Sequence, residues 1–383
     1  MPLADLALNM ASMRTQPPDS IRGRVAVAGL ALAAIGCTKA PPSAGSGGAV
    51  SSGGVASVGG LTAGGVDGGG GNANAGAPGT GGALPTPVPK YHPPAGFESC
   101  VHAEVKVDCE DGWCNLPPSC FVMGSPEGEW HRGRDSENQT AVTLTHWIEV
   151  QREELTRSEW TEITGLPAPG PEACTEGECP VAMVSWWDAV HAANLLSEQK
   201  GLEPCYEPVG CSGVLGQDLA CTGVAEPEKS AYECEGYRLP TRAEAEYAAR
   251  AGTISTFYSG DITVYEDDTV CHLDPALELI AWYCGNSGDR PHVGGELQAN
   301  GFGLFDMSGN LGEWTNEGST GASSPGGQDP NGQNGQNARR LRFSPQYDDK
   351  NWIARTAGLL SGPWESRGIR TGFRLFRTLP AAP

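Results

Sequence analysis

The feature that most restricts the fold of this chain is a segment of low complexity at residues 41–89. It consists mainly of glycine, serine, alanine and proline, with almost no charge and almost no large apolar side chain. Such a segment cannot bury enough apolar surface to offset its conformational entropy, so we predict a disordered tether over residues 38–95. The folded part of the 383-residue chain is then confined to residues 96–383, which we expect to form one domain.

The residues before the tether have the order of an export signal. Arg22 and Arg24 precede a short apolar run, residues 25–34, which leads to Cys37. The run has about ten residues, whereas a membrane-spanning helix needs about twenty, so we expect no permanent span. The motif "LAAIGC" is similar to the lipobox of bacterial lipoproteins.

On that resemblance, residues 1–37 are a lipoprotein signal peptide and Cys37 is the lipidated residue. The resemblance implies a lipid-anchored protein of the bacterial cell envelope, attached to the outer membrane, with its globular domain in the periplasm or outside the cell. A secretory signal with an incidental cysteine is the alternative.

The thirteen cysteines favour the same compartment. Without Cys37 their number is even, and in an exported chain disulfides are the default prediction. Zinc is the competing interpretation, but the close pairs lack the two-residue spacing of zinc knuckles. Sequence does not fix the pairing. We expect one disulfide loop to be closed by Cys271 and Cys284, and a second to be stapled by Cys205, Cys211, Cys221 and Cys234.

The net charge of −21 argues against nucleic acid and anionic lipid surfaces as partners. The same negative charge favours cations as ligands. A simpler interpretation is that the acidic surface keeps an exported protein soluble.

Three segments have both the start and the stop signals of a helix, with a capping box at the start and a glycine at the end. The cap, acid and glycine are Thr156, Glu159 and Gly165; Ser185, Asp188 and Gly201; and Thr241, Glu244 and Gly252. Brief strands are predicted at residues 141–150, 302–307 and 372–377. Together these segments predict an α+β domain with few regular elements, long loops and disulfide staples.

Seven motifs occur in the order typical of one family. They are "FVMGSPEGEW", "VTLTHWIEV", "EELTRSEW", "PVAMVSWWDAVHAANLLS", "YRLPTRAEAEYAARAGT", "ANGFGLFDMSGNLGEW" and "GFRLFR". The chain thus resembles the sulfatase-modifying-factor family, which includes the formylglycine-generating enzymes and relatives in the ergothioneine and pyoverdine pathways. The resemblance implies the formylglycine-generating-enzyme fold, which is distantly similar to C-type lectins.

The resemblance also implies a structural calcium site in the stretch "DMSGNLGEW". The side chains of Asp306 and Glu313 would bind the ion, together with the backbone carbonyls of Gly309 and Leu311. Calcium prefers about six to eight oxygen ligands, and a sharply folded, glycine-containing turn can aim carbonyls inward. A glycine-rich turn whose acids face water is the alternative.

The catalytic centre of the family has no counterpart in this sequence. The formylglycine-generating enzymes oxidise a substrate cysteine with copper held by two thiolates near the C-terminus. Here no cysteine follows Cys284, so we expect no copper and assign no catalytic residue. Another redox metal could be held by the pair His272 and Asp274 together with a distant histidine such as His292, in the manner of non-haem iron.

The function predicted from sequence is therefore a non-catalytic binding or scaffold module with an unknown protein or carbohydrate ligand. The alternative is an oxidoreductase of the same family that acts on a protein or small-molecule substrate. A third possibility is assistance in the assembly or maturation of exported proteins. Four arginines could line an anion-binding cleft, but ion pairs are the simpler expectation for Arg355, Arg367, Arg370 and Arg374.

Overall fold

The computed structural model describes residues 91–133, 137–225, 230–265, 269–319, 325–331, 339–343 and 345–383. The predicted signal peptide at residues 1–37, the lipidation at Cys37 and residues 38–90 of the predicted tether (residues 38–95) lie outside these residues. Residues 91–95 are described, and the ring of Tyr91 packs against that of His102, with centroids 5.0 Å apart. In the part of the chain that is described, no helix combines the length and the hydropathy that crossing a membrane requires.

The three predicted helices are confirmed, and each begins with the predicted capping box. They are α1 (Arg157–Thr164), α2 (Trp186–Gln199) and α3 (Arg242–Arg250). In α1 the threonine side chain at the N-cap accepts from the backbone of Glu159, whose carboxylate accepts from the threonine backbone in return. Gly165 ends this helix in the left-handed conformation, as predicted.

The strands are short and form four sheets. The first sheet has the order β1-β2-β5-β13, with β1 (Cys109–Glu110), β2 (Trp113–Leu116), β5 (Trp147–Gln151) and β13 (Phe376–Leu379). The second has the order β11-β10-β8-β12, with β11 (Leu360–Gly362), β10 (Arg339–Phe343), β8 (Gly312–Ser319) and β12 (Thr371–Gly372). The third has the order β3-β4-β9, with β3 (Ser119–Met123), β4 (Thr140–Leu144) and β9 (Gly327–Gln328). The last is a hairpin of β6 (Pro208–Val209) and β7 (Gly223–Val224).

All three strand predictions need correction. The segment 372–377 is divided between β12 and β13, which belong to different sheets, and residues 373–375 lie in no strand. Residues 141–150 form two strands in different sheets, because the chain turns at Thr145, whose N–H and hydroxyl both donate to Asp329. Residues 302–307 form no strand. There the side chain of Asn300 accepts from the backbone of Phe302 and Leu304, which gives the backbone a turn in place of a ladder.

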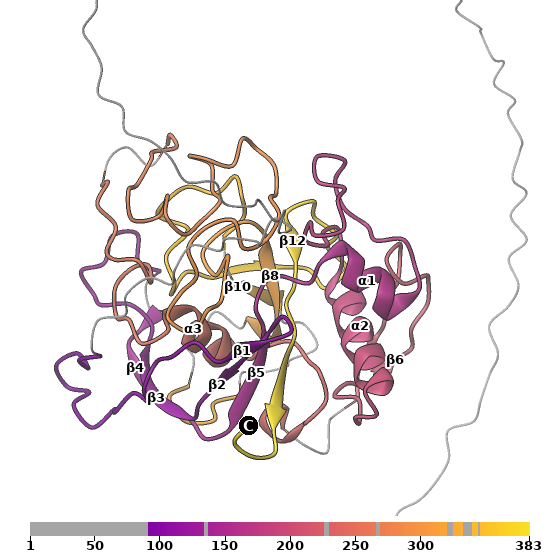
Figure 1. Cartoon of the computed structure of the whole chain (residues 1–383), viewed down its shortest axis with the longest axis horizontal. Helices are drawn as coiled ribbons and strands as arrows, with labels where there is room; N and C mark the ends of the chain where they lie inside the picture. The colour runs from indigo at the N-terminus through magenta and orange to yellow at the C-terminus, as the bar shows by residue number, and fades with distance from the viewer. Residues whose placement is uncertain are drawn as a thin grey trace, which may run out of the picture. The chain divides into compact units, whose positions relative to one another are not determined.

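The first sheet separates two hydrophobic cores. Side chains alternate along a strand, and in β2 the consecutive residues Trp113 and Cys114 pack in different cores. One core contains α1 and α2, which pack side by side, and the other contains α3 (Figure 1). The segment that leads into β8, residues 302–311, is buried throughout, so the predicted metal-binding turn lies in the interior.

Six disulfides pair all twelve cysteines that follow Cys37. The predicted bond between Cys271 and Cys284 is confirmed. The predicted second stapled region is confirmed as well, with Cys205 bonded to Cys234 and Cys211 bonded to Cys221. The other pairs are Cys100–Cys120, Cys109–Cys114 and Cys174–Cys179. Disulfides of this density indicate an oxidising, extracytoplasmic compartment.

Candidate metal centre

The turn at residues 306–313 is buried, and its two acids do not face water. Asp306 and Glu313 are each 1% exposed. Asp306 and Asn310 both adopt positive φ, +57° and +64°, a conformation that Asp and Asn tolerate better than most residues. Gly309 is required for a different reason, since a Cβ at this position would lie 2.5 Å from the carbonyl oxygen of Trp282. The sequence therefore folds this turn tightly against the neighbouring loop.

Two oxygen atoms in the turn have no hydrogen-bond partner. Asp306 accepts from the backbone N–H of Gly295 through Oδ2 at 3.0 Å, but its Oδ1 is buried and unpartnered. The hydroxyl oxygen of Ser308 is also buried and unpartnered. Buried polar atoms in proteins are nearly always satisfied, so these oxygens point to a water or a cation in the turn.

Glu154, which we did not predict, is a third buried acid and is hydrogen-bonded to the turn. Its Oε1 accepts from the N–H of Leu311 at 2.8 Å, and its Oε2 accepts from the side chain of Asn310 at 2.6 Å. It lies three residues beyond Gln151, the end of β5, and more than 150 residues before the turn. The pair of adjacent acids Glu153 and Glu154, at the end of a β-rich segment, was the available signal.

Glu313 forms a buried ion pair with Arg374. The guanidinium donates to both carboxylate oxygens, at 2.7–2.9 Å, and to the carbonyl of Phe305 at 3.0 Å. Burial alone lowers the pKa of Arg374, but the charge and hydrogen bonds of Glu313 raise it above its usual value, so the guanidinium stays charged. Glu313 therefore has a protein counter-ion, and a metal ion would have to share this carboxylate with the arginine.

Glu154 and Asp306 are not compensated in this way. Burial raises the pKa of Asp306 to about 7. Burial, followed by the negative charges of Asp306 and Glu313, raises the pKa of Glu154 well above its usual value. With Glu313 paired to Arg374, ionising both remaining acids leaves two negative charges in the interior, the amount that one divalent cation neutralises.

The donor set fits calcium. Carboxylate, hydroxyl and carbonyl oxygens are hard ligands, and the turn supplies Asp306 and Ser308 beside the carbonyls predicted at Gly309 and Leu311. Asp306 fits the role of a calcium ligand best, because its Oδ1 accepts no hydrogen bond. Glu313 remains a predicted ligand, but its carboxylate oxygens already accept hydrogen bonds from Arg374.

The iron alternative finds no support in the geometry. Among the described residues, the only group of three His, Cys, Asp or Glu ligand atoms within 4.8 Å of one another does not include His272, Asp274 or His292. Asp274 is fully buried and accepts backbone N–H groups from Thr263, Val264 and Ala276. His292 stacks on Trp282, with ring centroids 3.7 Å apart, and donates from Nε2 to the carbonyl of Ser287. Asp274 and His292 thus have structural roles.

The expectation for the four arginines is confirmed, because each of them forms an ion pair at 2.6–3.0 Å. The pairs are Arg355 with Glu129 and Glu137, Arg367 with Asp188, Arg370 with Asp348, and Arg374 with Glu313.

A cavity of 310 Å³ is linked to the turn through His292. His292 lines it, and the backbone N–H and carbonyl of His292 are both hydrogen-bonded to the side chain of Asn310 in the turn. The remaining lining residues are Ala173, Cys174, Thr175, Glu176, Cys179, Arg290, Val293 and Glu296. Its wall is therefore mostly polar and carries both signs of charge.

Comparison with known proteins places the chain among related domains. The family model "Sulfatase-modifying factor enzyme 1-like domain" matches residues 116–379. Formylglycine-generating enzyme of Mycobacterium tuberculosis is 43% identical over 241 residues, which cover 52% of this chain and 72% of that protein. Chaperone protein LppX of Paenibacillus barcinonensis is 28% identical over 208 residues, which cover 49% of this chain and 68% of that protein.

The fold has solved counterparts. The structure of Treponema denticola variable protein 1 matches with a TM-score of 0.54 and 21% sequence identity, covering 70% of this chain and 95% of that one. At this identity the likeness concerns the fold alone, and it agrees with the few helices and the several short sheets described above.

Proposed function

The chain belongs to the sulfatase-modifying factor enzyme 1-like domain family, and we propose that it is an exported, non-catalytic member that binds other exported proteins and assists their maturation. Its fold is that of the formylglycine-generating enzymes. The proposal includes the lipid anchor at Cys37, in the outer membrane of a bacterial envelope, with the tether at residues 38–95 giving the domain its reach.

The observation that carries the proposal is the state of the cysteines. No cysteine follows Cys284, where the thiolate pair of the catalytic relatives would lie, and the twelve cysteines after Cys37 are consumed by six disulfides. Copper(I) requires soft ligands such as thiolates, so the known cysteine oxidation has no supporting residues. The similarity to a protein named as a chaperone supports binding and assistance.

In this function calcium would stabilise the turn at residues 306–313. An ion between Asp306 and the carbonyls of Gly309 and Leu311 would neutralise the buried acids and stiffen the turn. Because Asn310 bonds to the backbone of His292, a rigid turn fixes one wall of the cavity that His292 lines. We place the contact with a partner at this cavity, whose charged groups suit a polar segment of a protein or a carbohydrate.

The test is a refolding assay with a secreted hydrolase denatured in guanidinium chloride. The purified protein should raise the yield of active hydrolase in proportion to its molar amount, and more in calcium than in chelator. Arg290→Glu, at the exposed rim of the cavity, should remove the effect, whereas Lys200→Glu, exposed after α2, should not. A yield no higher than that obtained with serum albumin would reject the proposal.

The second candidate is an oxidoreductase of the same family. It is favoured by the 43% identity with the mycobacterial formylglycine-generating enzyme. This candidate requires turnover of a cysteine-containing sulfatase peptide, which the refolding assay does not measure and which is addressed at the end of the Discussion.

A further inference from the structure

A histidine and a disulfide outside the metal centre have the spacing of a metal site. One ring nitrogen of His191 and the Sγ atoms of Cys211 and Cys221 all lie within 4.8 Å of one another. The two sulfurs are bonded to each other, so neither is a thiolate in this state. Reduction would convert the same three positions into two thiolates and one imidazole, the donor types that bind zinc.

The histidine already has the tautomer that a ligand needs. Its Nδ1 lies 2.8 Å from the carbonyl oxygen of Trp187. A carbonyl only accepts hydrogen bonds, so Nδ1 carries the proton and Nε2 keeps a free lone pair. Metal-binding histidines are held in this way, by a hydrogen bond from the other ring nitrogen to a backbone carbonyl or carboxylate.

The two cysteines face each other across a hairpin that backbone hydrogen bonds also join, between Ser212 and Ala220 in both directions and from Thr222 to Val209. The ladder pairs Val209 with Gly223, and a bridge further along pairs Ser212 with Ala220. Cys211 and Cys221 lie directly opposite in this register, with their Cα atoms 3.9 Å apart. Opened thiols would therefore stay adjacent, on the same face of the hairpin.

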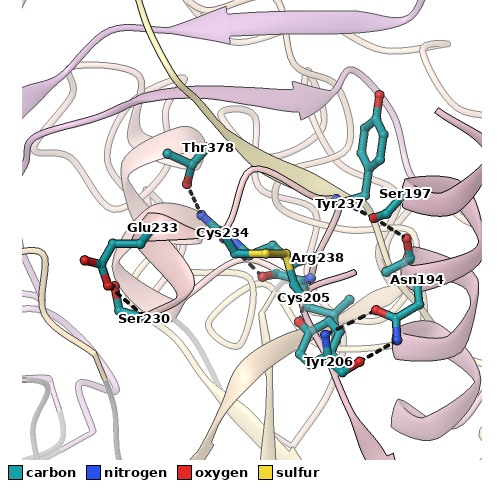
Figure 2. The surroundings of a disulfide bond; sticks show 12 residues. Asn194, Ser197, Cys205, Tyr206, Ser230, Glu233, Cys234, Tyr237, Arg238 and Thr378 are labelled. Atoms are coloured by element: carbon teal, nitrogen blue, oxygen red, sulfur yellow. Dashed lines mark hydrogen bonds between the residues drawn. A yellow bond between two sulfur atoms is a disulfide. The ribbon is translucent and has the colours of Figure 1, made fainter. Parts of the chain in front are cut away.

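Helix α2 holds this hairpin at two points, on either side of the histidine. Asn194 donates to the carbonyl of Tyr206 and accepts from its N–H, which fixes the entry to the hairpin (Figure 2). Asp188 accepts from the N–H of Gly216 at the hairpin tip. Asp188, His191 and Asn194 are spaced by three residues, so they share one face of the helix. The histidine is thus presented to the cysteines from a rigid support.

We propose that the Cys211–Cys221 disulfide is a redox gate on a zinc site formed with His191. An external dithiol supplies two electrons and two protons: the S–S bond breaks, two thiols form, and the dithiol becomes a disulfide. Zinc then binds both sulfurs and Nε2 of His191, and the two thiol protons are released. Water is the fourth ligand.

Exposure decides which disulfide a reductant reaches. Cys211 is exposed, and among the described cysteines only Cys271 is exposed as well. The bond between Cys271 and Cys284 has no histidine in a matching group, although His272 is its sequence neighbour. It is therefore a matched control that is equally accessible and lacks the third ligand.

The experiment uses the whole protein and zinc alone as the probe. After mild reduction and removal of the reductant without oxygen, zinc is titrated in competition with a chromophoric chelator, and alkylation with mass spectrometry identifies the opened cysteines. Reduced protein should bind about one zinc ion at least tenfold more tightly than oxidised protein. His191→Ala should weaken that binding at least tenfold, whereas His272→Ala should leave it unchanged.

Two double variants complete the test. Cys271→Ser with Cys284→Ser should keep the zinc site, and Cys211→Ser with Cys221→Ser should lose it. Cys211→His with Cys221→His needs no reduction and should bind zinc only when His191 is present, which covers the case in which reduction unfolds the chain. Zinc binding that is independent of His191, or that survives in the Cys211→Ser and Cys221→Ser variant, would overturn the proposal.

Discussion

Replacing Asp306 by asparagine separates a calcium site from a turn that merely contains acids. The substitution keeps the shape of the side chain and suits the positive φ at this position, but it removes the charge. In chelator the variant should be more stable than the wild type, because an uncompensated buried carboxylate opposes folding. In calcium this advantage should shrink or reverse, because an amide binds the ion more weakly than a carboxylate.

The size of the effect follows from the pKa of Asp306, which burial raises from 3.8 to about 7. At 1.36 kcal/mol per pKa unit this difference corresponds to about 4 kcal/mol. The folded state binds the proton more tightly than the unfolded state, so stability is highest below about pH 4, falls as the pH rises, and reaches its full deficit above about pH 7. Calcium at about a thousand times its Kd stabilises the folded state by about 4 kcal/mol, which is enough to offset the free energy lost by ionising Asp306.

The assay is calorimetric melting at about pH 8, in chelator and in saturating calcium. For a domain of this size about 4 kcal/mol corresponds to a change in Tm on the order of 10 °C. The wild type should show the larger calcium-induced rise, and Asp306→Ala, which also lacks the oxygen ligand, should show almost none.

Asp274→Asn is the matched control. Asp274 is also fully buried, but its carboxylate accepts three backbone N–H groups, so an amide would place its own N–H against donors. This variant should lose stability equally in calcium and in chelator. If Asp306→Asn behaves like Asp274→Asn, or keeps the full calcium response, the reasoning about the turn is refuted.

Three further substitutions test the surroundings. Glu313→Ala leaves a buried guanidinium unpaired and should cost about 3–5 kcal/mol in urea unfolding with or without calcium; a loss confined to calcium would contradict the ion-pair argument. Gly309→Ala would bring a Cβ to 2.5 Å from the carbonyl of Trp282, so we expect a loss of about 1–3 kcal/mol by the same method. Arg238→Met breaks the buried pair with Glu244 and should cost about 3–5 kcal/mol without changing the calcium response, which a melt in both buffers would check.

Local signals in the sequence predicted the local structure well. The capping box is complete within four residues, so Thr156, Ser185 and Thr241 could be assigned as N-caps without knowledge of the tertiary fold. The end of a helix is less well defined by sequence. For α3 the predicted stop was Gly252, but the helix is capped one residue earlier, by Ala251 in the left-handed conformation.

The candidate metal centre was only partly predictable, because its parts come from distant segments. The turn itself could be recognised, and Asp306 and Glu313 are both buried, while their role as calcium ligands stays a prediction. Glu154 could not be assigned, since its role depends on β5 ending beside the turn. The pairing of Glu313 with Arg374 likewise joins residues that no sequence pattern links.

The strand predicted at residues 302–307 failed for a physical reason. Its apolar residues are buried, as in a strand, but Asn300 supplies hydrogen bonds that favour a turn. Apolar patterning reports burial, and it does not distinguish an extended segment from an irregular one that is fixed by a side chain.

The measurement that tests the central claim most directly is mass spectrometry of a cysteine-containing sulfatase peptide after incubation with the protein, copper(I) and oxygen. The account predicts that the peptide mass stays unchanged at every ratio of copper to protein, while an active formylglycine-generating enzyme converts the same peptide. Catalytic conversion of the cysteine to formylglycine by this protein would contradict the account.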